Sequence, residues 1–116
     1  MAVICAVIPT WNEAKYIGEI VRQCKLYVDM VVVADDHSLD RTRDIARKEG
    51  AYVILNPGKQ GAGSNTAIGL AAACMLGADV IVTLDGDGQH DPNEIPKLLK
   101  PIIERQAELV IGVRNA

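Results

Sequence analysis

Residues 79–92 read Asp-Val-Ile-Val-Thr-Leu-Asp-Gly-Asp-Gly-Gln-His-Asp-Pro, and this stretch decides the expected fold. Its apolar run, Val80 to Leu84, is short and rich in β-branched residues, and it stops at two carboxylates separated by one glycine. A strand buried in a parallel sheet has this pattern when its carboxyl end delivers side chains to a ligand site. We therefore expect a buried strand that ends at Asp85.

Two acidic side chains, Asp85 and Asp87, occupy alternate positions in this stretch. Alternate residues of extended backbone point to the same side, so both carboxylates could converge on one hard divalent cation. Gly86 and Gly88 would let a phosphate group approach the backbone. The alternative is an ordinary acidic turn, because Asp-Gly is a common turn dipeptide. These residues alone leave both interpretations open.

Strands and helices alternate along the rest of the chain. Further apolar runs are typical of buried strands, and the segments between them space their apolar residues as helices do. The expected strands are residues 2–8, 30–34, 52–55 and 109–113; the expected helices are residues 13–27, one that ends near 49, one that begins after 64 and one that begins at 91. This order predicts an α/β domain with a mostly parallel sheet, helices on both faces and a ligand site at the carboxyl ends of the strands.

The helical spacing also predicts which side chains are buried. Helix 13–27 should bury Ile17, Ile20, Val21 and Cys24, and the helix after Ser64 should bury Ala67, Leu70, Ala71 and Cys74. The three cysteines, Cys5, Cys24 and Cys74, match neither a disulfide framework nor a zinc spacing, so we expect buried free thiols and a reducing compartment.

Two further strand ends carry candidate site residues. Trp11, the only tryptophan, follows the first strand, and a packing role is its alternative interpretation. The second strand ends at Asp35 and Asp36. Helix capping would explain Ser38 and Asp40, but it would not explain two adjacent carboxylates that repel each other, so at least one of them is expected to be functional. His37 is expected to be a polar loop residue.

A glycine-rich turn, residues 56–64, follows the third strand. Its backbone amides could cradle an anion. The spacing of Gly58, Gly61 and Gly63 matches neither the P-loop nor the dinucleotide fingerprint, so a flexible connector is an equally good interpretation.

Composition narrows the class of protein. A chain of 116 residues fits one domain, and its 12 Lys and Arg against 15 Asp and Glu give a net charge of −3. Nucleic-acid binding is excluded, because no basic run is present and aromatic residues are few. No apolar stretch approaches the ~20 residues of a membrane span, and the N-terminus has no charged signal-peptide region, so we expect an intracellular, cytoplasmic location.

Four motifs resemble, in order and spacing, the nucleotide-binding half of family 2 glycosyltransferases, which have the GT-A fold. They are Ile-Pro-Thr-Trp-Asn-Glu (8–13), Val-Val-Val-Ala-Asp-Asp-His-Ser-Leu-Asp-Arg-Thr (31–42), Thr-Leu-Asp-Gly-Asp-Gly-Gln-His-Asp-Pro (83–92) and Val-Ile-Gly-Val-Arg (110–114). The branch they resemble most is the dolichyl- or polyprenyl-phosphate mannosyl- and glucosyltransferases. The match covers Val3 to Arg114, so residues 1–116 are expected to form one Rossmann-like GT-A nucleotide-sugar-binding domain.

The resemblance implies inverting transfer of a hexose from a GDP- or UDP-linked sugar to a polyprenyl or dolichyl phosphate, with Mg²⁺ or Mn²⁺ as cofactor. It also assigns roles to individual residues. The nucleotide-binding residues would be Pro9, Trp11 and Glu13 around base and ribose, Asp36 as a hydrogen-bond acceptor for the base, Lys59 in the glycine-rich turn, and Asp85; the metal ligands would be Asp85, Asp87 and Gln89 of the DXD motif.

Three details depart from the family pattern. Trp11 stands where Tyr is usual, His37 stands where Gly is typical, and the turn from Gly58 to Gly63 has one extra residue. Family members also carry the acceptor-side half, with the proposed catalytic base and the groups that meet the lipid phosphate, after the position of Arg114. We therefore expect a catalytic base outside this chain, and absent or very weak transfer by the chain alone.

Several alternatives accompany this interpretation. The chain could be a non-catalytic nucleotide-binding module, or a phospho-acceptor receiver domain of similar length. A receiver would carry its acid pair after the first strand and a Lys after the fifth, where this chain has Pro9-Thr10 and Arg114. The apolar strands 80–84 and 109–113 would be left with uncovered edges, which predicts self-association or direct pairing of the two strands. A lipid-phosphate acceptor would place the protein peripherally at the cytoplasmic membrane face.

Overall fold

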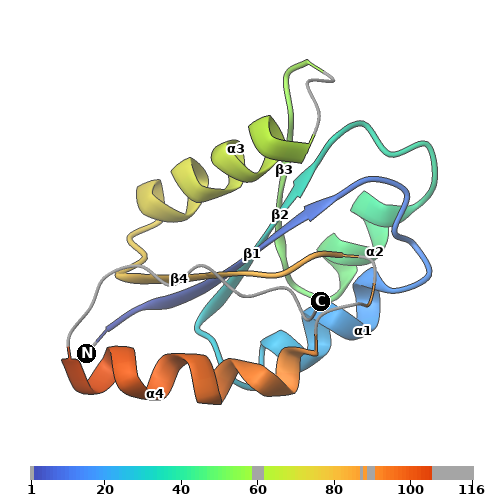
Figure 1. Cartoon of the computed structure of the whole chain (residues 1–116). Coiled ribbons are helices and arrows are strands. Elements are labelled where there is room, and N and C mark those ends of the chain that lie inside the picture. The colour runs from blue at the N-terminus through green and yellow to red at the C-terminus, as the bar shows by residue number, and fades with distance from the viewer. Residues whose placement is uncertain (1, 59–61, 87, 89–90, 106–116) are drawn as a thin grey trace.

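The chain folds into a parallel sheet with helices on both faces (Figure 1). The computed structural model describes residues 2–58, 62–86, 88 and 91–105. The strands in chain order are β1 (Ile4–Thr10), β2 (Met30–Asp35), β3 (Tyr52–Leu55) and β4 (Val80–Thr83), and the spatial order is β3-β2-β1-β4. The predicted α/β architecture is confirmed. The predicted strand 109–113 lies outside the described residues.

The strands are apolar on both sides because both faces of the sheet are covered. Val7 and Val32 belong to the cluster under α3 (Ala62–Met75), whereas Ala6 and Val31 belong to the cluster under the helices of the opposite face. β1 continues to Thr10, two residues beyond the predicted end. Proline is tolerated there because β4 pairs with β1 only as far as Val7, so Pro9 has a strand partner on one side only.

Three helices cover the face opposite α3: α1 (Ile17–Cys24), α2 (Thr42–Lys48) and α4 (Ile95–Arg105). α1 begins later than the predicted Glu13, because residues 13–16 form a turn in which the carbonyl of Glu13 accepts the N–H groups of both Tyr16 and Ile17. The predicted apolar stripe of this helix is confirmed, since all four of its members are buried: Ile17, Ile20, Val21 and Cys24.

The predicted buried face of α3 is wrong. Ala67, Ala71 and Cys74 are exposed and Leu70 is half-buried, whereas Asn65, Gly69 and Ala73 face the sheet. The cause is close packing: a Cβ added at Gly69 would lie 2.5 Å from Cγ1 of Val7. The helix can approach the sheet this closely only with its smallest residues inward.

Two of the three cysteines are buried, as predicted, and Cys74 is not. Burial raises the pKa of Cys5 to about 11 and that of Cys24 to about 12. Thiols with such pKa values are inert at neutral pH, which suits a purely structural role for these two residues.

The helix start predicted at Asp91 is confirmed. Its carboxylate accepts the N–H of Asn93 at 2.9 Å, and a single 3₁₀ turn, η1 (Pro92–Glu94), leads into α4. The N-cap residue of α2 is Arg41, but the carboxylate of Asp40 just before it accepts the N–H of Thr42, the first residue of the helix, at 3.0 Å. In the described part of the chain, no helix has the length and apolar character needed to cross a membrane.

Candidate functional site

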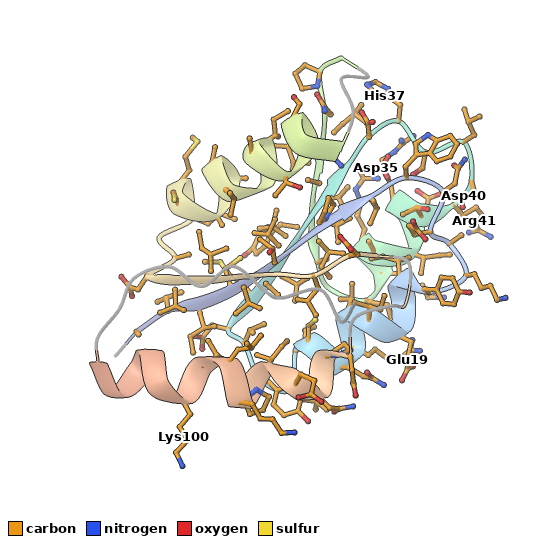
Figure 2. All side chains as sticks on the ribbon, viewed as in Figure 1. Glu19, Asp35, His37, Asp40, Arg41 and Lys100 are labelled. Atoms are coloured by element: carbon orange, nitrogen blue, oxygen red, sulfur yellow. The ribbon has the colours of Figure 1, made fainter. Side chains whose placement is uncertain are left out.

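The candidate site lies where the parallel strands end. Since parallel strands have their carboxyl ends at the same edge of the sheet, the segments after β1, β2 and β4 meet there. Figure 2 shows Asp35 and His37 near that edge, with Asp40 and Arg41 at the start of α2. The structure therefore brings together the predicted residues Pro9, Trp11, Glu13, Asp36 and Asp85.

Asp35 holds this edge together. Its side chain is fully buried, and one oxygen, Oδ1, accepts the hydroxyls of Thr10 at 2.8 Å and Ser38 at 2.5 Å. The other oxygen, Oδ2, accepts the N–H of Ser38 at 2.8 Å and Nη1 of Arg43 at 2.8 Å. Burial raises the pKa of Asp35, but the hydrogen bonds from Ser38, Thr10 and Arg43 outweigh it and the net pKa lies below its usual value. Asp35 is an ionised structural residue.

The neighbouring carboxylate, Asp36, is placed differently. Only 7% of the residue is exposed, and its N–H donates to the carbonyl of Thr10 at 3.0 Å. Its Oδ1 is buried and has no hydrogen-bond partner among the residues that the structure describes. A buried oxygen without a donor is unfavourable, so a ligand N–H that reached it would form an otherwise missing hydrogen bond. Of the two adjacent acids, Asp36 is the one available to a ligand.

The segment after β1 is fixed to the segment after β2 by hydrogen bonds. The N–H of Asn12 donates to Oγ of Ser38 at 2.8 Å, and Oδ1 of Asn12 accepts the N–H of Leu39 at 2.7 Å. The N–H of Glu13 donates to Oγ1 of Thr42 at 2.9 Å. Trp11, the residue before Asn12, is 47% exposed, so its ring offers a surface to a ligand and is not a core side chain.

The segment after β4 packs against the segment after β1. A Cβ added at Gly86 would lie 2.9 Å from Cγ2 of Thr10 and 3.3 Å from Cγ of Glu13. Only glycine fits this approach, which places half-buried Asp85, the residue before it, beside the first segment.

Three predicted site residues lie outside the described part of the chain: Lys59, Asp87 and Gln89. Among the residues that are described, no group of three or more His, Cys, Asp and Glu side chains could hold a metal ion. Carboxylate and amide oxygens at positions 85, 87 and 89 nevertheless have the donor chemistry that Mg²⁺ and Mn²⁺ prefer. In donor type, the sequence at this strand end fits a hard divalent cation.

Sequence reasoning missed two asparagines at the same edge. Asn56 and Asn65 are 0% and 2% exposed, and Nδ2 of Asn65 donates to the carbonyl of Ala34 at 2.6 Å. Within the described part of the chain, Nδ2 of Asn56 and Oδ1 of Asn65 have no hydrogen-bond partner. The available signal was position, because Asn56 directly follows β3 and the register that pairs Asp35 with Leu55 makes Asp36 and Asn56 the next residues of the two strands.

His37 is a polar residue of the loop after β2, as predicted, and it also contacts the end of β3. It adopts a left-handed backbone conformation, φ 62°, which non-glycine residues adopt uncommonly. Its Nε2 lies 2.6 Å from the carbonyl oxygen of Asn56, so the ring links the acidic turn to the end of β3. The positive φ value explains why glycine suits this position. A histidine here additionally contacts the carbonyl oxygen of Asn56, which a glycine could not do.

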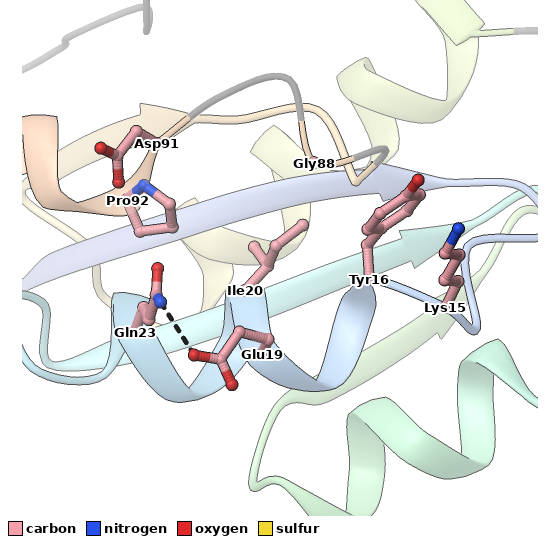
Figure 3. A pocket seen from close by; sticks show the side chains of 8 residues that line it. All are labelled: Lys15, Tyr16, Glu19, Ile20, Gln23, Gly88, Asp91 and Pro92. Atoms are coloured by element: carbon pink, nitrogen blue, oxygen red, sulfur yellow. Dashed lines mark hydrogen bonds between the residues drawn. The ribbon is translucent and has the colours of Figure 1, made fainter.

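A pocket of about 440 Å³ lies on the α1 side of the segment after β4 (Figure 3). Lys15, Tyr16 and Gln23 line it from the α1 side, and Gly88, Asp91 and Pro92 from the other. Tyr16 was not singled out by the sequence, yet Figure 3 shows it between Gly88 and Lys15.

The fold and this edge define a class: an α/β domain whose ligand site is built from strand-end loops and carboxylates. The chain belongs to glycosyl transferase family 2, since the model of that family matches residues 5–116. The resemblance to this family is thereby confirmed, and the receiver-domain alternative is wrong.

Named relatives agree with this assignment. The chain is 33% identical over 129 residues to the UDP-N-acetylglucosamine--dolichyl-phosphate N-acetylglucosaminyltransferase of Methanococcus voltae, covering 96% of this chain and 51% of the relative. It is 34% identical over 119 residues to the undecaprenyl-phosphate mannosyltransferase of Micrococcus luteus, covering 97% of this chain and 48% of the relative. The chain thus spans about half the length of these relatives.

A solved structure shows the same fold. Glucosyl-3-phosphoglycerate synthase from Mycobacterium tuberculosis, in complex with Mn²⁺, uridine diphosphate and glucosyl-3-phosphoglycerate, superposes with a TM-score of 0.73 at 26% identity. The match covers 87% of this chain and 39% of the synthase. The predicted GT-A fold is confirmed.

Proposed function

We propose that this chain is the nucleotide-sugar-binding half of a glycosyltransferase that moves a hexose from a uridine diphosphate sugar to a polyprenyl phosphate. The observation that carries the proposal is Oδ1 of Asp36, a buried carboxylate oxygen at the strand-end site to which no described residue donates a hydrogen bond. Uracil and guanine both present a ring N–H that such an oxygen could accept. UDP is favoured over GDP because the M. voltae relative uses a UDP sugar and the mycobacterial synthase binds UDP.

The roles of the other site residues are those that membership of the family implies for these positions of the sequence. Pro9, half-exposed Trp11 and Glu13 would line the base and ribose, and Lys59 would face the nucleotide from the glycine-rich turn. Asp85, with Asp87 and Gln89, would hold Mg²⁺ or Mn²⁺. When bound, such a cation offsets the negative charge that develops on the departing diphosphate.

The acceptor side of the reaction would depend on residues that have no counterpart here. We expect the base that accepts the proton of the acceptor, and the groups that bind the lipid phosphate, in the half of the relatives that this chain does not match. Without them the acceptor is neither positioned nor deprotonated, so transfer by this chain alone should be absent or very weak. A lipid-phosphate acceptor would also bring the complete enzyme to the membrane surface.

Calorimetry tests the proposal directly. The chain should bind UDP in the presence of Mn²⁺, more weakly in EDTA, and should bind ADP much more weakly, because adenine has no ring N–H for Asp36. GDP included in the panel tests the preference for uridine. Failure to bind any nucleoside diphosphate or nucleotide sugar with Mn²⁺ would overturn the proposal, and tighter binding of GDP than of UDP would overturn the choice of base.

A further inference from the structure

We propose that Tyr16 is a positioning residue for the acidic segment after β4, and that its ring fixes the backbone that carries the metal-binding carboxylates. The inference rests on the proposed metal-dependent nucleotide binding and extends it to a side chain outside the acidic motif. Tyr16 acts through the backbone of Gly88 and does not touch the nucleotide.

The first observation is the contact between Tyr16 and Gly88. A Cβ added at Gly88 would lie 3.0 Å from Cδ1 of the Tyr16 ring and 3.3 Å from both Cε1 and Cγ. Gly88 has a φ of +84°, a conformation that side-chain-bearing residues rarely adopt. The backbone of Gly88 therefore lies against one side of the tyrosine ring, in a conformation and at a distance that suit glycine.

The second observation is another close contact of the same segment, two residues earlier, at Gly86. A Cβ at Gly86 would meet Cγ2 of Thr10 at 2.9 Å and the carbonyl oxygen of Pro9 at 3.3 Å. Gly86 and Gly88 flank Asp87 in the sequence. The described residues of this segment thus make two close contacts, one at Gly86 with the end of β1 and one at Gly88 with Tyr16.

The third observation is that Tyr16 is itself anchored. Its N–H donates to the carbonyl of Glu13 at 3.0 Å, and its own carbonyl accepts the N–H of Ile20 at 3.1 Å. The ammonium of Lys15 lies 5.4 Å from the ring centroid. Figure 3 shows the ring standing between Lys15 and Gly88. The backbone that carries the Tyr16 side chain is thereby fixed at the start of α1, next to the first segment.

The exposure of Tyr16 argues against a purely packing role. The residue is 40% exposed, so it is not part of the core, and its removal should cost the fold little. Loss of its contact should instead give the segment around Gly88 more freedom. Residues that orient metal ligands through a second contact typically change metal affinity by about 10–100-fold when they are removed.

The experiment compares Tyr16→Ala, Tyr16→Phe and a control, Tyr52→Ala. Tyr52 is a surface tyrosine of similar character, 56% exposed on β3. UDP binding is measured by calorimetry across a series of Mn²⁺ concentrations and again in EDTA. Tyr16→Ala should raise the Mn²⁺ concentration for half-maximal enhancement about 10-fold and leave UDP affinity in EDTA within about twofold. Tyr16→Phe should match the parent, because the contact uses ring carbons only.

A second readout needs neither metal nor nucleotide. The Gly88 amide signal in a ¹⁵N-resolved NMR spectrum should shift in Tyr16→Ala, because the ring current is lost, and should hardly move in Tyr16→Phe or Tyr52→Ala. An unchanged Gly88 signal in Tyr16→Ala would refute the contact. Circular dichroism of each variant identifies any that fails to fold, in which case Tyr16→Leu replaces Tyr16→Ala.

The outcomes separate this inference from the proposed function. If the parent shows no Mn²⁺-dependent UDP binding, both the proposed function and the positioning role of Tyr16 are refuted. If the parent binds as proposed and Tyr16→Ala keeps the parent's Mn²⁺ requirement, only the positioning role is overturned. An equal loss of UDP affinity with Mn²⁺ and in EDTA would also overturn it, because that result indicates general damage to the site.

Discussion

Replacing Asp35 by alanine should lower the free energy of unfolding by about 3–5 kcal/mol, because it removes a buried carboxylate that accepts hydrogen bonds from Thr10, Ser38 and Arg43. The structure shows where the loss arises. In Asp35→Ala, the hydroxyls of Thr10 and Ser38 can rotate to other acceptors. The N–H of Ser38 and Nη1 of Arg43 instead lose Oδ2 of Asp35, the oxygen to which both of them donate. Each of these hydrogen bonds to a charged group contributes about 1.5–3 kcal/mol.

Asp35→Asn should cost less, about 1–3 kcal/mol, because the amide oxygen can keep the N–H of Ser38 and the guanidinium of Arg43. Its NH₂ can then donate to the rotated hydroxyls of Thr10 and Ser38. Asp44→Ala on α2 is the matched control, because Asp44 is exposed and its nearest cation, Arg47, is 3.9 Å away. This control should change stability by no more than about 0.5 kcal/mol.

Urea unfolding followed by circular dichroism measures these differences. The folded pKa of Asp35 lies below its usual value of 3.8, so its stabilising effect is complete above that pH and is lost as pH falls through the folded pKa. The difference in the free energy of unfolding between the parent and Asp35→Asn should therefore become smaller in acid. A loss below about 1 kcal/mol for Asp35→Ala at neutral pH, or a loss no larger than that of Asp44→Ala, would refute the structural role.

Three further substitutions separate binding from folding. Asp36→Ala should weaken UDP binding by about 1.5–3 kcal/mol both in Mn²⁺ and in EDTA, and equal affinity by calorimetry would contradict a base contact. Asp87→Ala should differ from the parent in Mn²⁺ but not in EDTA; a difference that persists in EDTA would mean that this carboxylate is no metal ligand. Gly69→Ala should lower stability by about 1–3 kcal/mol in urea unfolding, because its Cβ would clash with Val7, and unchanged stability would contradict that packing.

The strands were predictable because a strand covered on both faces needs an unbroken apolar run, and few other elements have one. The predicted strands 30–34, 52–55 and 80–84 agree with β2, β3 and β4 to within a residue. The end of β1 was less predictable. Whether Pro9 ends a strand depends on whether a neighbouring strand needs its missing N–H, and that is a property of the whole sheet.

The face of α3 could not be read from its sequence, because the helix consists mostly of small residues on every side. Without large apolar side chains there is no stripe to follow. Gly69 faces the sheet because the helix lies very close to β1. Asn65 faces the sheet because its side chain donates a hydrogen bond to the carbonyl of Ala34. Neither cause leaves a periodic signal.

The candidate site was predictable in its location but not in the division of roles. The sequence showed that Asp35 and Asp36 stand together at a strand end and that one of them should be functional. It could not show that Ser38 and Arg43 donate to Asp35, or that an oxygen of Asp36 has no partner among the described residues. Tyr16 was not identified for a similar reason, since its proposed positioning role rests on a contact with Gly88, which is distant in the sequence.

The position of the single tryptophan makes its fluorescence a probe of the proposed site. Trp11 is 47% exposed beside Asn12 and Glu13, and no second indole exists elsewhere in the chain to obscure it. Indole emission responds to the polarity around the ring, so a nucleotide that covers Trp11 should change both the intensity and the colour of the fluorescence. Occupancy of the proposed site could then be followed in dilute solution with unlabelled protein, for every variant that retains this residue.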